Sequence, residues 1–281
     1  MAIKIIKQQN RKYGFSLIEI SVVLLIFGLM IGGIMSALTQ ETRIAKQAEL
    51  KMKMDAIEKA IAAYVKKNNY LPCPADGTYT ISVANFGLTG GTAGGGTCSN
   101  GATYDGNGNR TANTTPPTVN FYLGNIAGGV VPIRALGLPD EYGIDPWGGK
   151  FSYAVDKRFT ATSSFITYNL ISTTGGITVS DDGGNAIVSN AIAVVFSHGQ
   201  NGHGAFQLSG SIKNSGSTNA HELVNCHCTS AAAAGVYSAS FFTSLTTSTS
   251  SSDLRTVFDD TLRYYTRGSF LTNNDKTMEL K

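Results

Sequence analysis

Residues 15–38 form an apolar segment in which Glu19 is the one formally charged side chain. A helix over these 24 residues has a length of about 36 Å, which is enough to cross a bilayer. A carboxylate costs about 2.5–3.5 kcal/mol at the centre of a membrane, so an acid in such a segment needs a partner. The pattern therefore predicts a transmembrane helix over residues 15–38 in which Glu19 pairs with a cation.

The helical pattern continues beyond this segment. Residues 39–69 are polar and rich in helix formers, and a series of apolar side chains follows helical spacing: Leu50, Met54, Ile57, Ile61, Tyr64 and Val65. A continuous helix over both segments is roughly 80 Å long, and Pro72 and Pro74 follow its expected end. We expect the apolar face of its outer half to pack against a folded domain.

Downstream, short runs rich in β-branched or aromatic residues alternate with Gly, Asn, Asp and Pro. This pattern predicts antiparallel strands at residues 121–123, 151–155, 165–171, 176–179 and 191–196. Residues 75–118 are dense in Gly, Thr and Asn and predict a long loop. The Ser/Thr-rich tract 243–252 predicts a loop or an edge strand. Residues 253–265 predict a short helix, with its apolar face made by Leu254, Val257, Phe258 and Leu262.

The charge of the chain is unevenly distributed. The formal net charge is +3, but residues 1–14 contain four basic side chains and no acid, which leaves 18 basic and 19 acidic side chains in the remainder. Such a balance argues against a nucleic-acid partner, because nucleic-acid binding requires a basic surface. Basic residues before a membrane segment stay in the cytoplasm, so the rest of the chain is expected on the opposite side.

The run Gly14-Phe15-Ser16-Leu17-Ile18-Glu19 resembles the cleavage and methylation site of type IV prepilins and of type II secretion pseudopilins. The resemblance implies that prepilin peptidase cuts between Gly14 and Phe15 and methylates the new amine of Phe15. Glu19 then occupies the fifth mature position, where its carboxylate pairs with the terminal ammonium of a neighbouring subunit during assembly. The alternative is a plain membrane anchor with an incidental acid near one interface.

The same resemblance implies an α+β, type IV pilin-like fold, in which a long amino-terminal helix packs its outer half on an antiparallel sheet. It divides the chain into a cytoplasmic leader (1–14), a transmembrane and filament-core helix (15–38), an outer helix (39–69) and a periplasmic β-rich domain (70–281). The implied location is a bacterial inner membrane, with a single pass. The implied partners are prepilin peptidase, other pilin or pseudopilin subunits, the inner-membrane assembly platform and inner-membrane lipid.

Four cysteines, namely Cys73, Cys98, Cys226 and Cys228, lie in the part expected in the oxidising periplasm, where disulfides persist. Four cysteines allow three pairings. A bridge from Cys73 to Cys98 closes a glycine-rich loop of modest length and is the preferred pairing. A bridge from Cys226 to Cys228 requires an unusually tight ring, and crossed bridges between the early and late pairs stay open.

Asp145-Pro146-Trp147-Gly148 has the residue preferences of a type I turn, with Trp147 as an expected packing anchor. It resembles a segment that leads into the sheet of the major pseudopilin of type II secretion. Major pseudopilins also carry a calcium site in their carboxy-terminal loops. Asp105, Asn107 and Asn109 alternate with glycines as calcium ligands do, but lack a closing Glu, so a turn-rich linker without a cofactor is favoured. Residues 181–185 predict a hairpin turn rather than a second calcium loop.

Histidines and cysteines near the end of the chain suggest two further kinds of chemistry. His198 and His203 follow an apolar strand, yet the surrounding glycines favour a turn and the nucleophile-elbow pattern is incomplete. His221 with Cys226-His227-Cys228 offers zinc ligands, but the usual Cys-Xaa-Xaa-Cys spacing is missing and a disulfide is favoured. The sequence therefore predicts a protein that is not an enzyme.

The chain also departs from the family pattern. Ser36 stands where many pilins and major pseudopilins have proline, and Gly32-Gly33 precede it, which softens the helix or serves close helix packing. Size and loop content exceed those of a streamlined major subunit. The sequence thus predicts a minor pilin or pilin-like structural subunit. Alternatives are a type II secretion pseudopilin, an anchored adhesin with Ser/Thr/Gly-rich binding loops, and an anchored periplasmic enzyme.

Overall fold

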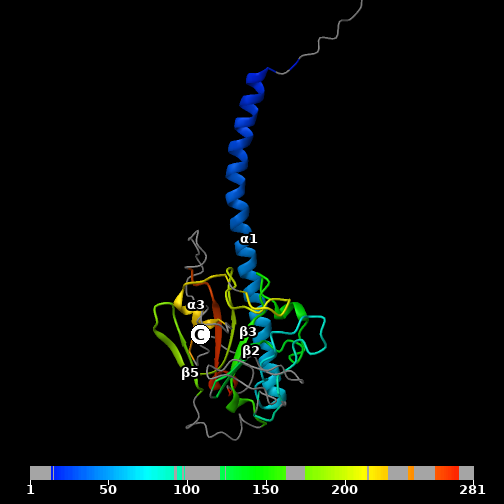
Figure 1. Cartoon of the computed structure of the whole chain (residues 1–281), viewed down its shortest axis with the longest axis vertical. Coiled ribbons are helices and arrows are strands. Elements are labelled where there is room, and N and C mark those ends of the chain that lie inside the picture. Colours follow the sequence, from blue (N-terminus) through cyan, green and yellow to red (C-terminus); the bar gives the residue numbers. More distant parts are fainter. Residues whose placement is uncertain are drawn as a thin grey trace, which may run out of the picture. The chain divides into compact units, whose positions relative to one another are not determined.

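The computed structural model describes residues 14, 16–91, 94–96, 98, 121–123, 125–162, 175–213, 215–226, 240–243 and 257–271. Their architecture is α+β, with an amino-terminal helix followed by a β-sheet (Figure 1). The chain divides into two compact units, Met1–Ala48 and Glu49–Lys281, and helix α1 (Leu17–Asn68) contributes to both. The α+β class predicted from the sequence is confirmed.

Helix α1 contains 52 residues and continues through Gly32-Gly33 without interruption. It ends at Asn68, and the next residue, Asn69, adopts a positive φ of 61° and donates its N–H to the Val65 carbonyl at 2.8 Å. A left-handed residue after the last turn is a common helix terminator, and the prolines that follow prevent continuation. Lys66 and Lys67 lie in the last turn, where positive charge interacts favourably with the helix dipole.

Among the described residues, no helix combines the length and the apolar character needed to cross a membrane.

The second unit is built on a seven-stranded sheet with the order β1-β2-β3-β5-β4-β6, and β7 pairs with β5 beside this path. The strands are β1 (Phe121–Leu123), β2 (Ile126–Val130), β3 (Ser152–Asp156), β4 (Ile177–Ser180), β5 (Ala186–Ser197), β6 (Ser240–Phe242) and β7 (Thr261–Thr266). Strands β2, β3 and β5 are neighbours in Figure 1. The pairings are antiparallel except that of β4 with β6, which is parallel, so the prediction of a wholly antiparallel sheet is wrong at this edge.

Strand β5 organises the sheet because it pairs with three other strands. Its first half pairs with β4, where Ile177 opposes Ala191 and Ser180 opposes Ala186. Its second half pairs with β3, where Ser152 opposes Phe196, and also with β7. The residues from 191 to 197 are buried, whereas most of those from 186 to 190 are exposed. The sequence predicted only the buried half of this strand.

The prediction of a short helix over residues 253–265 is wrong for residues 257–265, the part of that range that the structure describes. Residues Thr261–Thr266 form β7, and Leu262 pairs with Phe196 while Arg263 pairs with Val195. Aromatic and β-branched residues favour a strand here, and pairing with β5 supplies backbone hydrogen bonds that override the helical spacing. Two short 3-10 helices, η1 (Asp140–Gly143) and η2 (Lys157–Phe159), and the helices α3 (Ala220–Asn225) and α4 (Arg267–Leu271) complete the described elements.

The main core of the second unit lies between the end of α1 and the sheet. Five helix side chains at helical spacing are buried there: Leu50, Met54, Ile57, Ile61 and Val65. They join Tyr153 and Val155 of β3 and Ala193 and Val195 of β5 in one cluster. Tyr64, the sixth residue of the predicted face, is only partly buried. The amphipathic pattern therefore correctly predicted the face that packs.

A disulfide joins Cys73 to Cys98, with a Cα–Cα distance of 5.2 Å, and it is the pairing that the sequence analysis preferred. It closes the connection between α1 and the sheet within the core cluster. Cys226 is also disulfide-bonded, and Cys228 lies outside the described residues. Because Cys73 pairs with Cys98, crossed bridges between the early and late cysteines are excluded.

Two basic side chains hold the loop that follows Cys73. The Lys150 Nζ donates to the carbonyls of Gly77 and Tyr79, at 2.7 Å each. Burial lowers the pKa of Lys150 to about 8. Arg134 forms an ion pair with Asp140 and also donates to backbone carbonyls between residues 81 and 84. These contacts satisfy backbone carbonyls in the described part of the loop.

Candidate functional site

The predicted processing segment lies at the start of α1. Gly14 is exposed, and a Cβ atom placed on it meets no other atom within 4 Å. Phe15, the predicted methylated residue, lies outside the described residues. Ser16 precedes the first helical residue, Leu17, and Ile20 donates its N–H to the Ser16 carbonyl at 3.2 Å. The predicted cut between Gly14 and Phe15 therefore falls just before the helix, beside an accessible residue.

Ser16 and Glu19 cap the helix reciprocally. The Ile18 N–H donates to the Ser16 Oγ at 3.3 Å, and the Ser16 N–H donates to the Glu19 Oε2 at 2.9 Å. This is a capping box, in which each side chain satisfies a backbone donor that the helix leaves unpaired. A carboxylate in the first turn also interacts favourably with the helix dipole. The sequence analysis missed this role, although the Ser-Xaa-Xaa-Glu spacing carries it.

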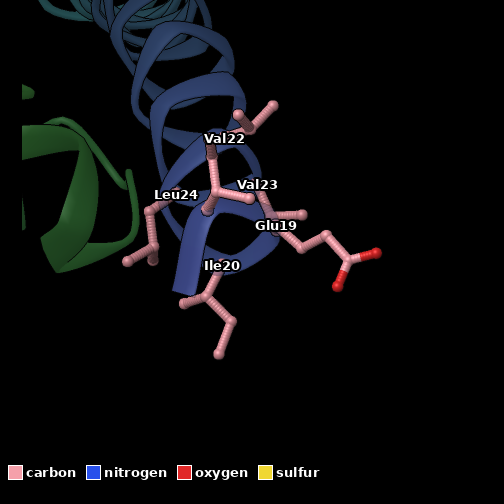
Figure 2. A pocket seen from close by; sticks show the side chains of 6 residues that line it. Glu19, Ile20, Val22, Val23 and Leu24 are labelled. Carbon is pink, nitrogen blue, oxygen red and sulfur yellow. The ribbon is translucent and has the colours of Figure 1, made fainter. Parts of the chain in front are cut away.

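Glu19 lies among exposed apolar residues at the start of α1. A pocket at the start of α1 is lined by Glu19 and by five apolar residues, namely Ile18, Ile20, Val22, Val23 and Leu24. Figure 2 shows side chains extending outward around the helix, with the Glu19 carboxylate directed away from the ribbon. Large apolar residues continue to be exposed as far as Met30. Such a surface is typical of a segment that other apolar groups cover, in lipid or in an assembly.

The segment Asp145-Pro146-Trp147-Gly148 forms the predicted turn. The Gly148 N–H donates to the Asp145 carbonyl at 3.1 Å, and the Asp145 Oδ1 accepts from the N–H groups of Trp147 and Gly149. The Asp145 Oδ2 accepts from the Ser197 Oγ at 2.6 Å, which ties the turn to the end of β5. Burial raises the pKa of Asp145. Trp147 packs against the main core cluster, so this motif has a structural role.

The two calcium candidates from the sequence have different outcomes in the structure. Asp105, Asn107 and Asn109 lie outside the described residues. The Asp181 Oδ1 accepts from the N–H groups of Gly183 and Asn185, at 2.9 and 2.8 Å, and closes the turn between β4 and β5. These bonds lower the pKa of Asp181. The run at 181–185 is therefore the hairpin turn that the sequence predicted.

The histidines after β5 are buried in polar contacts. The His198 Nε2 lies 2.9 Å from the Ser152 Oγ, and His198 and Ser152 are fully buried. The His203 Nδ1 accepts from the Ser215 N–H at 3.2 Å, and burial lowers the pKa of His203. A serine beside a histidine suggests a nucleophile and a base, but a fully buried pair offers no surface to a substrate. These contacts are those of a packed loop.

The zinc hypothesis is not supported by the described part of its ligand set. Cys226 is disulfide-bonded and therefore has no thiolate to offer. His221 packs edge-on against Phe258, with ring centroids 5.5 Å apart. His227 and Cys228 lie outside the described residues.

The prokaryotic N-terminal methylation motif matches residues 9–35. This range contains Gly14, Ser16 and Glu19 as well as the apolar start of α1. The chain therefore carries the cleavage and methylation segment of type IV prepilin-like and pseudopilin-like proteins. No curated protein and no solved structure matches the chain significantly.

Several functional consequences follow from the motif itself. It belongs to structural subunits rather than to enzymes, it implies processing by prepilin peptidase and assembly with other pilin-type subunits, and it indicates a membrane-anchored protein of the cell envelope. The geometry at the start of α1 agrees with this class, because Gly14, the residue before the predicted cut, is accessible and the following apolar side chains are exposed.

Proposed function

We propose that this chain is a minor pilin or pilin-like structural subunit, cut after Gly14 and assembled into or onto a type IV filament. The methylation motif over residues 9–35 carries the proposal. The exposed apolar start of α1 supports it, because this surface suits burial among like helices. In this proposal the chain is anchored in the inner membrane before assembly, with residues 70–281 in the periplasm.

The loop content of the second unit favours a minor over a major subunit. The described part of the connection after α1 is held by a disulfide and by the buried side chain of Lys150. Such a connection adds surface to each subunit, which suits a protein that primes or decorates a filament better than one that forms the whole shaft. A pilin-like arrangement of helix and sheet is part of this proposal.

A pseudopilin of a type II secretion system is the second candidate. The turn at Asp145-Pro146-Trp147-Gly148 favours it, because a similar segment leads into the sheet of major pseudopilins, and here the turn precedes β3. The two candidates share processing and assembly and differ in the machine that they serve. Deletion of the gene distinguishes the two candidates. Loss of secretion with intact pili supports the pseudopilin, whereas loss of pili with intact secretion supports the minor pilin.

The processing step is tested by the intact mass and the amino-terminal sequence of the protein from host membranes. We expect a chain that begins at a methylated Phe15. The matched variant is Gly14→Val, which we expect to stay uncut. Since a Cβ at position 14 meets no other atom within 4 Å, loss of cutting in this variant reports peptidase recognition rather than misfolding. A wild-type chain that still begins at Met1 contradicts the proposal.

A further inference from the structure

Helix α1 begins just beyond the proposed cut. Gly14 and Ser16 both lie outside the helix, and the first helical residue is Leu17. Peptidases act on exposed segments without helical structure, so the rate of cutting follows the fraction of molecules in which the bond lies outside a helix. The position of the helix start therefore decides whether the bond after Gly14 is available to a peptidase.

Ser16 fixes this position with its backbone and its side chain. Its carbonyl accepts from the Ile20 N–H at 3.2 Å, and its Oγ accepts from the Ile18 N–H at 3.3 Å, as expected of an N-cap residue. Its own N–H donates to the Glu19 Oε2 at 2.9 Å. In a helix that extended further back, this N–H would donate to the carbonyl four residues earlier. The Glu19 carboxylate therefore occupies the donor that an extension of the helix needs.

The sequence on both sides of this boundary favours a helix, so the boundary needs a local signal. Residues 4–13 contain neither glycine nor proline and include several good helix formers, and the apolar residues from Leu17 onward continue the helix. Gly14 interrupts this tendency, because glycine is among the least favourable residues in a helix. The cap at Ser16 completes the interruption two residues later.

Packing within the part of the chain that the structure describes does not account for these two residues. A Cβ atom placed on Gly14 meets no other atom there within 4 Å, and Ser16 is exposed. The hydrogen bonds of Ser16 described above reach only residues 18, 19 and 20, in the first turn of the helix. Substitution at Ser16 is therefore expected to change the helix start and to leave the folded second unit intact.

We infer that Ser16 is a positioning residue for the cutting step, because its cap sets the helix boundary that presents the bond after Gly14 to the peptidase. This inference rests on the proposed cut after Gly14 and names a residue that determines how well the segment is recognised. Ser16 acts through the backbone conformation, without contact between its hydroxyl and the peptidase. A shifted helix start lowers the fraction of chains that the peptidase can bind.

The test follows cutting of the full chain in detergent by purified prepilin peptidase, with KM and kcat measured separately. We expect Ser16→Ala to raise KM roughly three- to fivefold and to leave kcat unchanged, because the variant lowers the binding-competent fraction and does not alter the chemistry. The upper value corresponds to about 1 kcal/mol, the usual loss when alanine replaces a serine cap. The product forms more slowly and still begins at Phe15.

Two further variants separate the cap from the hydroxyl group. Ser16→Asn keeps a side-chain acceptor at the helix start and lacks a hydroxyl, so we expect its KM to stay close to the wild-type value. Ser21→Ala is the matched control, because the Ser21 Oγ donates to the Ile18 carbonyl at 2.8 Å and does not cap the helix. Amide hydrogen exchange of the uncut chain should change at residues 14–20 in Ser16→Ala and not in the other two variants.

The outcomes distinguish this inference from the proposed function. A wild-type chain that the peptidase does not cut contradicts the proposed function and, with it, the role of Ser16. If the wild type is cut and Ser16→Ala has the same KM and kcat, the inference alone is overturned. An equal loss in Ser16→Asn and Ser16→Ala also overturns it and indicates direct contact between the hydroxyl and the peptidase. A lower kcat with unchanged KM in Ser16→Ala leads to the same conclusion.

Discussion

Replacement of Arg263 by Ala is expected to lower the free energy of unfolding by about 3 kcal/mol, because it leaves a buried acid without its counter-charge. Arg263 lies on β7, and its Nη1 is 2.7 Å from the Glu58 Oε2 while its Nη2 is 2.5 Å from the Asp55 Oδ1. The Glu58 side chain is 9% exposed, and burial raises its pKa. Removing one member of a buried pair costs about 3–5 kcal/mol, and the partial exposure of Arg263 places this case at the low end.

Denaturant unfolding of the full chain in detergent measures this loss. The matched control is Glu49→Gln, which removes only the ion pair between Glu49 and Lys53, one helical turn apart. The Glu49 side chain is 44% exposed. We expect a change below about 0.5 kcal/mol there. The double variant Glu58→Met with Arg263→Met is expected to recover much of the loss, since apolar replacement of both partners removes the unpaired charge. A loss below about 1 kcal/mol for Arg263→Ala would mean that the helix and β7 are joined by packing alone.

The ion pairs of Arg263 also explain why the packing face of α1 could be predicted from the sequence, whereas strand β7 could not. The packing face of α1 repeats every three or four residues, so Met54, Ile57 and Ile61 could be recognised from spacing alone. The sequence before and within β7 has apolar residues that also fit a helix. Its strand conformation comes from pairing with β5 and from the ion pairs of Arg263 with α1, about 200 residues earlier in the chain. No local pattern contains that information.

The processing segment and the buried acids near β7 divide in the same way. The processing segment is contiguous, so the order Gly14, Ser16 and Glu19 carries the whole signal, and the methylation motif matches it. The acid cluster joins Glu222 to residues 259 and 260 through amides at 201 and 225, and its spacing matches no continuous metal-binding loop. Such a cluster exists only after the sheet has formed, whereas the local pattern of oxygen ligands in the sequence indicated residues 105–109.

At Glu19 we expect the amide variant Glu19→Gln to lower incorporation into filaments at least tenfold while it preserves the start of α1. Glutamine can still accept the Ser16 N–H, because either Glu or Gln completes a capping box. It cannot supply the negative charge that pairs with the terminal ammonium of a neighbouring subunit in our proposal. A tenfold effect corresponds to about 1.4 kcal/mol, which is modest for a charge pair shielded from water. Quantification of the subunit in sheared filaments and in membranes measures the ratio.

Comparison with Glu19→Ala separates the two roles of the carboxylate, because alanine removes both the charge and the cap. If charge pairing dominates, both variants are excluded from filaments to a similar degree, and each remains cut and methylated at Phe15. If Glu19→Gln incorporates like the wild type while Glu19→Ala does not, the carboxylate serves the helix start and the proposed pairing is wrong. Glu41→Gln is the control, because Glu41 is an exposed acid on the same helix beyond the apolar segment, and we expect it to leave incorporation unchanged. The capping geometry seen in the isolated subunit is therefore what makes glutamine, rather than alanine, the informative substitution.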